Sequence, residues 1–564
     1  MRKKRANYDL LVLFFFLVVS VLMVFPFVHT GNLEITNDGV FHLQRIDEIY
    51  ANLKSGHFTS IATHTFSRMG LASFEFYPSV FLYPWAILRF VFKPVTAFYA
   101  GWGILIFITL VIAYFSMMRF SNKNLVRSIS FALIYGLSGK YLTEFARFQI
   151  GEMIAYSFLP IVFLGFYEIV FNSNSKGIVT LATGLALVAY SHVLTTYLCI
   201  MLMIILFVIA LLRNFVDRTK LVLLIKSAIL FMLLAVWQYV PFISNDFSKV
   251  IAPPGFSFWP VQANDVWSAS WSNSISSDSS IGIILIIILV FGWIVVNSNR
   301  EKWVYALGVF ICIITTSLFP WGYVAKTALI KLFIPLQFSF RFLPLAVLFL
   351  SVTGSLMAEK IVKKSKLYIP VLMIVIFGSY VNAVRPLMNN IQKNNIVFLS
   401  NKKNSDFMLP PAINVNNETY NNIDKYIAPL GSVDYITKAA LTNNNYRSIQ
   451  NHETIVGGVR EKTSARCEAN KFVFDLYGKK GQNVDLPVIK YNRTMVTINN
   501  KKVSSKISYR GSVKIKLLRT GKQIIKVYYK PTVLFYALLA VAILSWLFIC
   551  VYLFRKRELY EKDS

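Results

Sequence analysis

The sequence has 564 residues, of which 55% are hydrophobic and only 15% are charged. A soluble domain carries about a quarter charged residues, so this composition excludes an ordinary cytosolic enzyme and a disordered chain. Lys and Arg outnumber Asp and Glu by 58 to 27. Because long apolar runs recur along the chain, we expect much of this excess to set membrane topology, and we predict no nucleic-acid partner.

The hydropathy pattern predicts an all-α polytopic membrane protein. Twelve spans are expected, at about 9–29, 95–117, 125–139, 153–171, 177–191, 193–212, 221–243, 280–296, 303–319, 342–358, 367–384 and 532–553. The stretch 80–92 contains Pro84 and Arg89 and is interpreted as a helix lying in the outer interface. This count places both termini in the cytoplasm and gives every short inner loop a positive charge.

The loops divide the chain into three parts. Residues 1–384 form the transmembrane domain, with outer loops at 30–94, 140–152, 244–279 and 320–341. Residues 385–531 form an extracellular segment, and 532–564 form the last helix and a basic cytoplasmic tail. The large loops all lie on one side of the predicted membrane, so we expect the function to be carried out on the outer face.

The late outer segment changes character along its length. Between about 470 and 530, short β-rich runs separated by Gly or Asn turns predict a β-sandwich-like, mainly β domain before the last helix. Residues 385–532 hold 25 Lys and Arg against 9 Asp and Glu, a net charge of +16. Such a surface suits an anionic wall polymer or lipid headgroups. The alternative is an ordinary solvated surface.

The first outer loop carries the first group of candidate catalytic residues. Asn37 and Asp38 are N-cap residue types, and helical periodicity follows over 40–53. At 100° per residue, Asp38, His42 and Arg45 fall together on one edge of that helix, beside its apolar stripe. A carboxylate there can accept a proton from an attacking hydroxyl, and an arginine can bind a phosphate bidentately. The alternative is a capped amphipathic helix whose polar side chains face water.

Histidine placement adds to this pattern. On the predicted topology all six histidines lie on the outer side or at the outer ends of spans: His29, His42, His57, His64, His192 and His452. His192 falls at the turn between the fifth and sixth spans, from where it can face the same cavity as His42. With Asp38 these side chains are candidates to hold a divalent metal such as Mg²⁺ or Mn²⁺, or to bind a phosphate. No spacing requires a metal, so no cofactor is certain.

Three other loops contribute candidates. Glu152 is a possible second acid in the second outer loop, where Arg147 is a candidate substrate-binding residue; the alternative is a local Glu–Arg pair that caps helix ends. Arg341 lies among aromatic residues at the start of the tenth span, where it can anchor a lipid phosphate or simply snorkel to the interface. Trp267 offers an indole face to a sugar ring, although tryptophans also mark any membrane interface.

Several motifs are absent from the sequence. No predicted span has an acidic residue near its middle, which argues against an ion-coupled transporter. No Walker loop, nucleophile elbow or dinucleotide fingerprint occurs in a suitable context. Cys467 stands alone among polar residues, so no extracellular disulfide is expected within the chain.

Five short motifs, in this order, resemble a known superfamily: Asn37-Asp38-Gly39-Val40-Phe41-His42, Gly70 with Phe76-Tyr77-Pro78, Ser191-His192-Val193-Leu194-Thr195, Gln337-Phe338-Ser339-Phe340-Arg341, and the closing series Leu486-Pro487, Tyr491, Gly521 and Val527-Tyr528-Tyr529-Lys530-Pro531. Together they resemble bacterial multi-span proteins of the GT-C glycosyltransferase superfamily. More narrowly, they resemble the Gram-positive membrane family labelled "6-pyruvoyl-tetrahydropterin synthase-related", a relative of the YfhO-like proteins. The resemblance covers nearly the whole chain.

The resemblance implies an integral membrane enzyme that moves a sugar from a polyprenyl-phosphate carrier to a cell-envelope acceptor, a glycan or a teichoic-type polymer. It places the base or metal-ligand role on Asp38, a second acid at Glu152 and a phosphate-binding role at Arg341. The chain departs from the usual pattern because Asp38 has no adjacent acid. Two non-enzymatic alternatives stay open: a flippase or transporter of a lipid-linked intermediate, and a membrane protein that tethers wall polymer.

Overall fold

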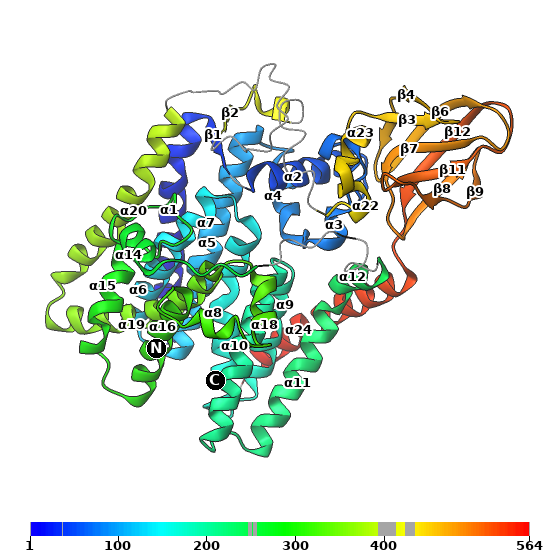
Figure 1. Ribbon diagram of the computed structural model, residues 1–564. Coiled ribbons are helices and arrows are strands. Elements are labelled where there is room, and N and C mark those ends of the chain that lie inside the picture. Colours follow the sequence, from blue (N-terminus) through cyan, green and yellow to red (C-terminus); the bar gives the residue numbers. More distant parts are fainter. Residues whose placement is uncertain are drawn as a thin grey trace.

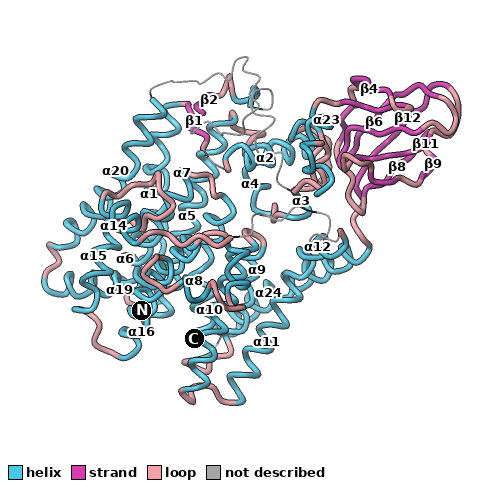
Figure 2. Tube along the Cα trace, in the orientation of Figure 1, coloured by secondary structure: helices cyan, strands magenta, loops and turns pink. Residues whose placement is uncertain are grey.

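The structure is a computed structural model that describes residues 2–36, 38–245, 251, 257–392, 413–423 and 435–562. A bundle of helices carries a small two-stranded sheet at one end, and a separate unit of β-sheets stands beside that end (Figure 1, Figure 2). The prediction of a mainly helical chain with a β-rich region before the last helix is confirmed. In Figure 1, α1 begins and α24 ends on the side of the bundle away from the β-sheets.

Eight helices in the described residues are long and apolar enough to cross a membrane, which makes this a multi-pass membrane protein. They are α1 (Arg2–Thr30), α5 (Pro94–Phe120), α8 (Ile150–Val170), α10 (Val193–Leu212), α11 (Arg218–Ala235, continued by α12, Val240–Ser244), α19 (Leu343–Lys364), α20 (Tyr368–Gln392) and α24 (Val533–Lys562).

The remaining four expected spans are helical but short, so the count of twelve is not confirmed. They are α6 (Leu125–Gly136), α9 (Lys176–Ala189), α15 (Ile283–Phe291) and α16 (Asn299–Thr315). A helix needs about 20 residues to cross the hydrocarbon core. These shorter helices pack against the long ones, α6 against α5 and α19, and α9 against α8 and α11.

The segment between α1 and α5 lies at the end of the bundle that carries the β-sheets. It contains β1 (Asn32–Ile35), α2 (Gly39–Lys54), α3 (Ser73–Phe76) and α4 (Tyr83–Leu88). The stretch 80–92, expected as an interfacial helix, forms a short 3₁₀ turn followed by α4. β1 pairs antiparallel with β2 (Ile413–Asn416), so the first and the late segments share one sheet.

The helix expected over 40–53 is present as α2, and the alternative interpretation, in which its polar side chains face water, is wrong for His42 and Arg45. His42 and Arg45 are buried, as is Glu48 one turn further on. Periodicity identified the apolar stripe, but the loop after α2 folds back over the polar face. Polar side chains on this helix are therefore satisfied by the protein rather than by water.

Glu48 fixes that loop. Its carboxylate accepts hydrogen bonds from the backbone N–H groups of Thr63, His64 and Thr65, at 2.8–2.9 Å. Gln44 accepts from the N–H of Phe66, at 2.7 Å. The next residues, 66–68, hold positive φ angles near 52° although none is glycine, so these side chains keep the backbone in an unfavourable conformation.

The same loop makes hydrogen bonds to the β-sheet unit. Met69 accepts a backbone hydrogen bond from Ile489 at 2.8 Å, and Asn470 accepts one from the N–H of Ser60 at 2.7 Å. At the base of the unit, Asn245 after α12 donates to the hydroxyl of Tyr529 at 2.6 Å. The unit is therefore attached to both the first segment and the helical bundle.

Short elements connect these parts. They are α7 (Gly139–Ala146), α14 (Ala263–Trp271), α17 (Trp321–Val324), α18 (Ile330–Phe333), the 3₁₀ turn η6 (Ser339–Phe342), α22 (Lys438–Leu441) and α23 (Tyr446–Gln450).

The β-sheet unit is a sandwich of two antiparallel five-stranded sheets within the described residues. One sheet has the order β10 (Lys506–Ile507), β11 (Ser512–Lys516), β7 (Asn483–Ile489), β3 (Glu453–Val456) and β4 (Val459–Lys462). The other has β5 (Arg466–Glu468), β6 (Lys471–Gly478), β12 (Gly521–Tyr529), β8 (Thr494–Ile498) and β9 (Lys501–Val503). Alternate residues of both sheets fill one apolar core, among them Phe474, Leu486, Ile498 and Ile525.

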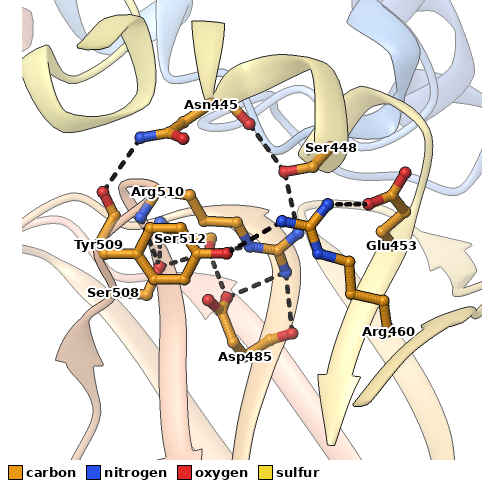
Figure 3. Close-up of polar contacts among 9 residues, drawn as sticks. All are labelled: Asn445, Ser448, Glu453, Arg460, Asp485, Ser508, Tyr509, Arg510 and Ser512. Atoms are coloured by element: carbon orange, nitrogen blue, oxygen red, sulfur yellow. Dashed lines mark hydrogen bonds and ion pairs between the residues drawn. The ribbon is translucent and has the colours of Figure 1, made fainter. Parts of the chain in front are cut away.

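A buried ion pair ties α23 to the sandwich (Figure 3). The side chain of Arg510 is 1% exposed, and its Nη2 donates to the Oδ1 of Asp485 at 3.1 Å and to the carbonyl of that residue at 2.9 Å. Its Nη1 donates to Ser448 of α23 at 3.2 Å. Nearby, Arg460 pairs with Glu453 at the surface. The two arginines thus make similar contacts at very different depths.

This contrast predicts different effects of removing each arginine. We expect Arg510→Ala to lower the free energy of unfolding of the sandwich by about 3–5 kcal/mol, because Asp485 is then buried without its cation. Arg460→Ala, the matched control at the surface, should cost less than about 1 kcal/mol. Thermal unfolding and protease resistance of the full chain in detergent measure both. Equal stability of the two variants would contradict the role of the buried pair.

Candidate active site at the ends of α8, α10 and α19

Three charged or titratable side chains from distant parts of the sequence meet at one end of the bundle. Glu152 lies in the first turn of α8, His192 is the N-cap of α10, and Arg341 lies in η6 just before α19. The Nε of Arg341 is 3.1 Å from Oε1 of Glu152, and Nε2 of His192 is 3.8 Å from the same oxygen. All three begin helices at the same end, which brings them together.

The tautomer of His192 follows from its own helix. Nδ1 accepts a hydrogen bond from the backbone N–H of Thr195 at 3.3 Å and lies 2.9 Å from the hydroxyl of that residue. In a neutral ring the proton is then on Nε2, which faces Glu152. Burial, together with Arg341, lowers the pKa of His192 to about 4 although Glu152 opposes the shift. The ring is therefore neutral at pH 7.

Tyr77 joins this cluster to the first segment. Its ring centroid is 5.8 Å from that of His192 and 5.5 Å from that of His42. Its hydroxyl lies so close to Gly151 that a Cβ there would be 2.3 Å away, so only glycine fits. Burial raises the pKa of Tyr77 well above its usual value, as do the nearby groups Tyr435, Glu152 and Asp38, whereas Arg45 opposes the shift. The two candidate acids, Glu152 and Asp38, thus both raise the pKa of the same phenol.

Arg45 is fully buried, and in the described part of the chain backbone carbonyls rather than a carboxylate bind it. Its Nη2 donates to the carbonyls of Tyr77 and Pro78 at 2.9 and 2.8 Å. Its guanidinium lies 4.6 Å from the Tyr77 ring centroid and also faces Phe41 and Phe74. Burial lowers the pKa of Arg45 to about 10. Its Nε and Nη1 have no hydrogen-bond partner among the described residues.

Other buried nitrogen atoms of the cluster also lack a hydrogen-bond partner among the described residues. Within the part of the chain that the structure describes, Arg341 Nη1 and the ring nitrogen Nδ1 of His42 have no hydrogen-bond partner, and Lys140 Nζ has only its ion pair with Glu144. Burial, Arg45 and His192 together lower the pKa of His42 well below its usual value. Buried polar groups in folded proteins are almost always paired, and exceptions call for a functional explanation. A bound anion would satisfy several of these donors at once.

A fully buried ion pair lies behind Glu152. Lys140 and Glu144 of α7 are 3.7 Å apart, and neither side chain is exposed. Lys140 also lies 5.2 Å from the ring centroid of Phe340, next to Arg341. Burial raises the pKa of Glu144 to about 8; Lys140 lowers it and Glu152 raises it. The alternative interpretation of this loop, a local Glu–Arg pair, does not hold for Arg147, because Arg147 binds Asp278 instead, at 2.7 Å.

The other predicted site residues are placed differently. Asp38 is exposed at the start of α2, and its side chain makes no capping hydrogen bond to that helix. Trp267 lies in α14, half exposed, and stacks on Trp271 at 6.0 Å. Arg147 is occupied by Asp278. The structure therefore gathers Glu152, His192 and Arg341, brings His42, Arg45 and Asp38 close through Tyr77, and places Trp267 and Arg147 in contacts of their own.

No metal site is evident in the described residues. No three His, Cys, Asp or Glu side chains there are grouped so that they could hold a metal ion. His42 and His192 lie near Tyr77, but His452 lines a separate small cavity with Arg68. The Mg²⁺ or Mn²⁺ site remains a prediction, and the described side chains do not form a ligand set for such an ion.

Two tyrosines of this cluster, Tyr77 and Tyr435, were not predicted as site residues from the sequence. Tyr77 belongs to the Phe76-Tyr77-Pro78 motif, which was a usable signal. Tyr435 lies in the late segment, stacks on Phe41 at 5.9 Å and faces Tyr77 at 6.3 Å. Its carbonyl accepts a hydrogen bond from Tyr491 of the sandwich unit at 2.9 Å. Nothing near Tyr435 in the sequence indicates this position.

Comparison with known proteins gives limited matches. No family model and no curated protein matches the chain. Among solved structures, arabinofuranosyltransferase AftD from Mycobacteria has a TM-score of 0.42 and 14% identity, over 67% of this chain but only 27% of its own length. ArnT from Cupriavidus metallidurans bound to undecaprenyl phosphate has a TM-score of 0.28 and 11% identity, over 64% of this chain and 78% of its own. Neither likeness is close enough to assign a fold or a function.

The Glu152–Arg341 pair predicts a stability effect that a second substitution reverses. Arg341→Gln should destabilise the protein by about 3 kcal/mol, because it leaves the carboxylate of Glu152 buried without its cation. The double variant Arg341→Gln with Glu152→Gln removes both charges and should recover most of that loss. Thermal unfolding in detergent measures each variant. A double variant less stable than Arg341→Gln alone would contradict the pairing.

The lowered pKa of His192 predicts a pH dependence. The pKa of His192 is 6.5 in the unfolded chain and about 4 in the folded protein, so the folded state disfavours the protonated ring. Its contribution to stability is fully present above pH 6.5 and is lost as the pH falls toward 4, by about 3 kcal/mol in total. His192→Gln should therefore lose less stability than the wild type between pH 7 and pH 5 in thermal unfolding. Replacement of the exposed His57 by Gln is the control, and should behave as wild type.

Proposed function

We propose that this protein is an integral membrane glycosyltransferase that transfers a sugar from a polyprenyl-phosphate-linked donor to an acceptor of the cell envelope. The observation that carries the proposal is the buried cluster of Glu152, His192 and Arg341, with unpartnered guanidinium nitrogens on Arg341 and Arg45. The cluster lies where apolar helices end, which is the depth of a phosphate on a membrane-bound carrier. Arginine is the side chain best suited to bind phosphate bidentately.

The proposed reaction is a direct displacement. The acceptor hydroxyl attacks the anomeric carbon of the sugar, and Asp38 takes the proton from that hydroxyl. The bond between the anomeric carbon and the phosphate oxygen breaks, and the polyprenyl phosphate leaves with its charge stabilised by Arg341 and Arg45. Glu152 holds Arg341 and the neutral ring of His192 in place. Asp38 suits the role of base because it is exposed to an incoming acceptor, whereas Glu152 is buried.

The proposal assigns the large segments to the outer face of the cell membrane and both termini to the cytoplasm. The exposed lysines on strands β9, β10 and β11 of the sandwich support an anionic acceptor such as a teichoic-type polymer; they are Lys501, Lys502, Lys506, Lys514 and Lys516. Membership of the YfhO-like relatives of the GT-C superfamily is part of this proposal. A flippase of a lipid-linked intermediate and a tether for wall polymer are the outcomes if no sugar is transferred.

Asp38 gives the sharpest test of the chemistry. We expect Asp38→Asn to leave folding intact and to reduce sugar transfer by about 10²–10⁴-fold, as for loss of a general base. The measurement is release of polyprenyl phosphate from a panel of polyprenyl-phosphate sugars by the full chain in liposomes. Asp265→Asn, an exposed acid of α14, is the matched control. Full activity in Asp38→Asn would remove the role of base from this residue, and no release by the wild type with any donor would overturn the enzyme proposal.

The basic sandwich predicts salt-dependent binding of an anionic polymer. Binding of teichoic-type polymer by the full chain in detergent should weaken at least tenfold between about 50 and 500 mM salt, because exposed charges are screened. Replacing Lys501, Lys502 and Lys506 by Gln should weaken binding at low salt without changing donor cleavage. Surface plasmon resonance measures this. Binding that is insensitive to salt, or absent, would leave only a solvated surface.

A further inference from the structure

A second candidate site lies at the opposite end of α8 from Glu152. A groove of about 620 Å³ opens between α5, α8, α9 and the end of α24. Its volume falls within the range of ligand pockets, about 300–1,000 Å³. One part of its wall is apolar, with Val111, Ile112, Phe115, Ile161, Leu164 and Leu553. The lining residues on α8, Ile161 and Leu164, are nine and twelve residues beyond Glu152 on the same helix, which places the groove about 14–18 Å along that helix from the proposed active site.

The other part of the wall is polar and cationic. It contains Arg119 near the end of α5, Lys176 at the start of α9, and Thr180 one turn further along α9. Arg119 donates through Nε and Nη2 to the carboxylate of Glu168, at 3.1 and 2.5 Å, and through Nη2 to Thr180 at 3.0 Å. Its Nη1 makes no hydrogen bond within the described part of the chain, and its side chain is 42% exposed.

Two cationic side chains line this mouth. Arg119 keeps part of its guanidinium exposed beside its bonds to Glu168 and Thr180, and Lys176 adds an ammonium group, so an anion is favoured there. Glu168 and Thr180 also fix the guanidinium plane, which lowers the entropy cost of binding. The groove thus combines a cationic mouth with an apolar wall along the helices, and it matches an amphiphile with a negative head and apolar chains.

We propose that this groove binds an anionic glycerophospholipid, with the headgroup phosphate at Arg119 and Lys176 and the chains against α5, α8 and α24. The site is independent of the proposed sugar transfer. It joins the last helix, α24, to the helices of the bundle through a lipid rather than only through side chains.

Native mass spectrometry of the full chain in detergent tests the proposal. The probes are dimyristoyl phosphatidylglycerol and dimyristoyl phosphatidylcholine, which have the same chains but differ in head charge. The wild type should retain phosphatidylglycerol about tenfold more tightly than phosphatidylcholine. Lys176→Gln, at an exposed position that does not disturb folding, should weaken retention of phosphatidylglycerol about fivefold. Lys123→Gln, an exposed lysine just beyond α5 that does not line the groove, should leave it unchanged.

A variant that blocks the groove provides a second test of the proposal. Ile112→Trp fills the apolar part of the groove and should abolish retention of both lipids. Equal retention of the two lipids by the wild type, or wild-type retention of phosphatidylglycerol by Ile112→Trp, would overturn the proposal. Undecaprenyl phosphate is added as a competitor. If it displaces phosphatidylglycerol one for one at equal concentration, the occupant is a prenyl carrier and the phospholipid assignment is wrong.

Discussion

The carboxylate of Glu48 organises the end of the molecule where the candidate site lies. By accepting from three successive backbone N–H groups, it folds residues 63–65 onto α2. That loop then bonds to the sandwich, and α2 carries Arg45 to the carbonyls of Tyr77 and Pro78. One buried acid thus fixes the position of a loop, a domain and a catalytic candidate. A buried carboxylate is stable only when its oxygens are satisfied in this way.

The candidate site contains an unusual amount of buried charge. Glu152 and Arg341 form one pair, Lys140 and Glu144 a second, and Arg45 has no acidic partner among the residues that the structure describes. Removing such groups from water costs several kcal/mol each, and buried ion pairs are rarely a net source of stability. Their concentration at one end of the helices is therefore better explained by what they bind. Perturbed titratable groups that share a location are typical of functional sites.

How much of this the sequence predicts depends on the range of the interactions. Apolar runs locate all the long helices, because burial in lipid demands continuous hydrophobicity. The same signal also marks α6, α9, α15 and α16, which are helical but shorter than the eight long helices, so length rather than hydropathy separates the two groups. Periodicity locates α2 but misplaces its polar face, because it carries no information about the loop that covers Glu48. Glu152, His192 and Arg341 were each singled out separately. Their contact, and that of Tyr435 with Phe41, depends on tertiary packing over distances of up to several hundred residues.

The pairing of β1 with β2 has a consequence for biosynthesis. Asn32 lies opposite Asn416, and the two strands are separated by most of the helical bundle along the chain. A ribosome therefore inserts α1 to α20 into the bilayer while the first segment still lacks its partner strand, its sandwich and Tyr435. Non-local pairings of this kind form late because loop closure must come first. The nascent bundle then lacks the strand that pairs with β1, and the contacts of Tyr435 with Phe41 and Tyr77, until residues 413–435 have emerged.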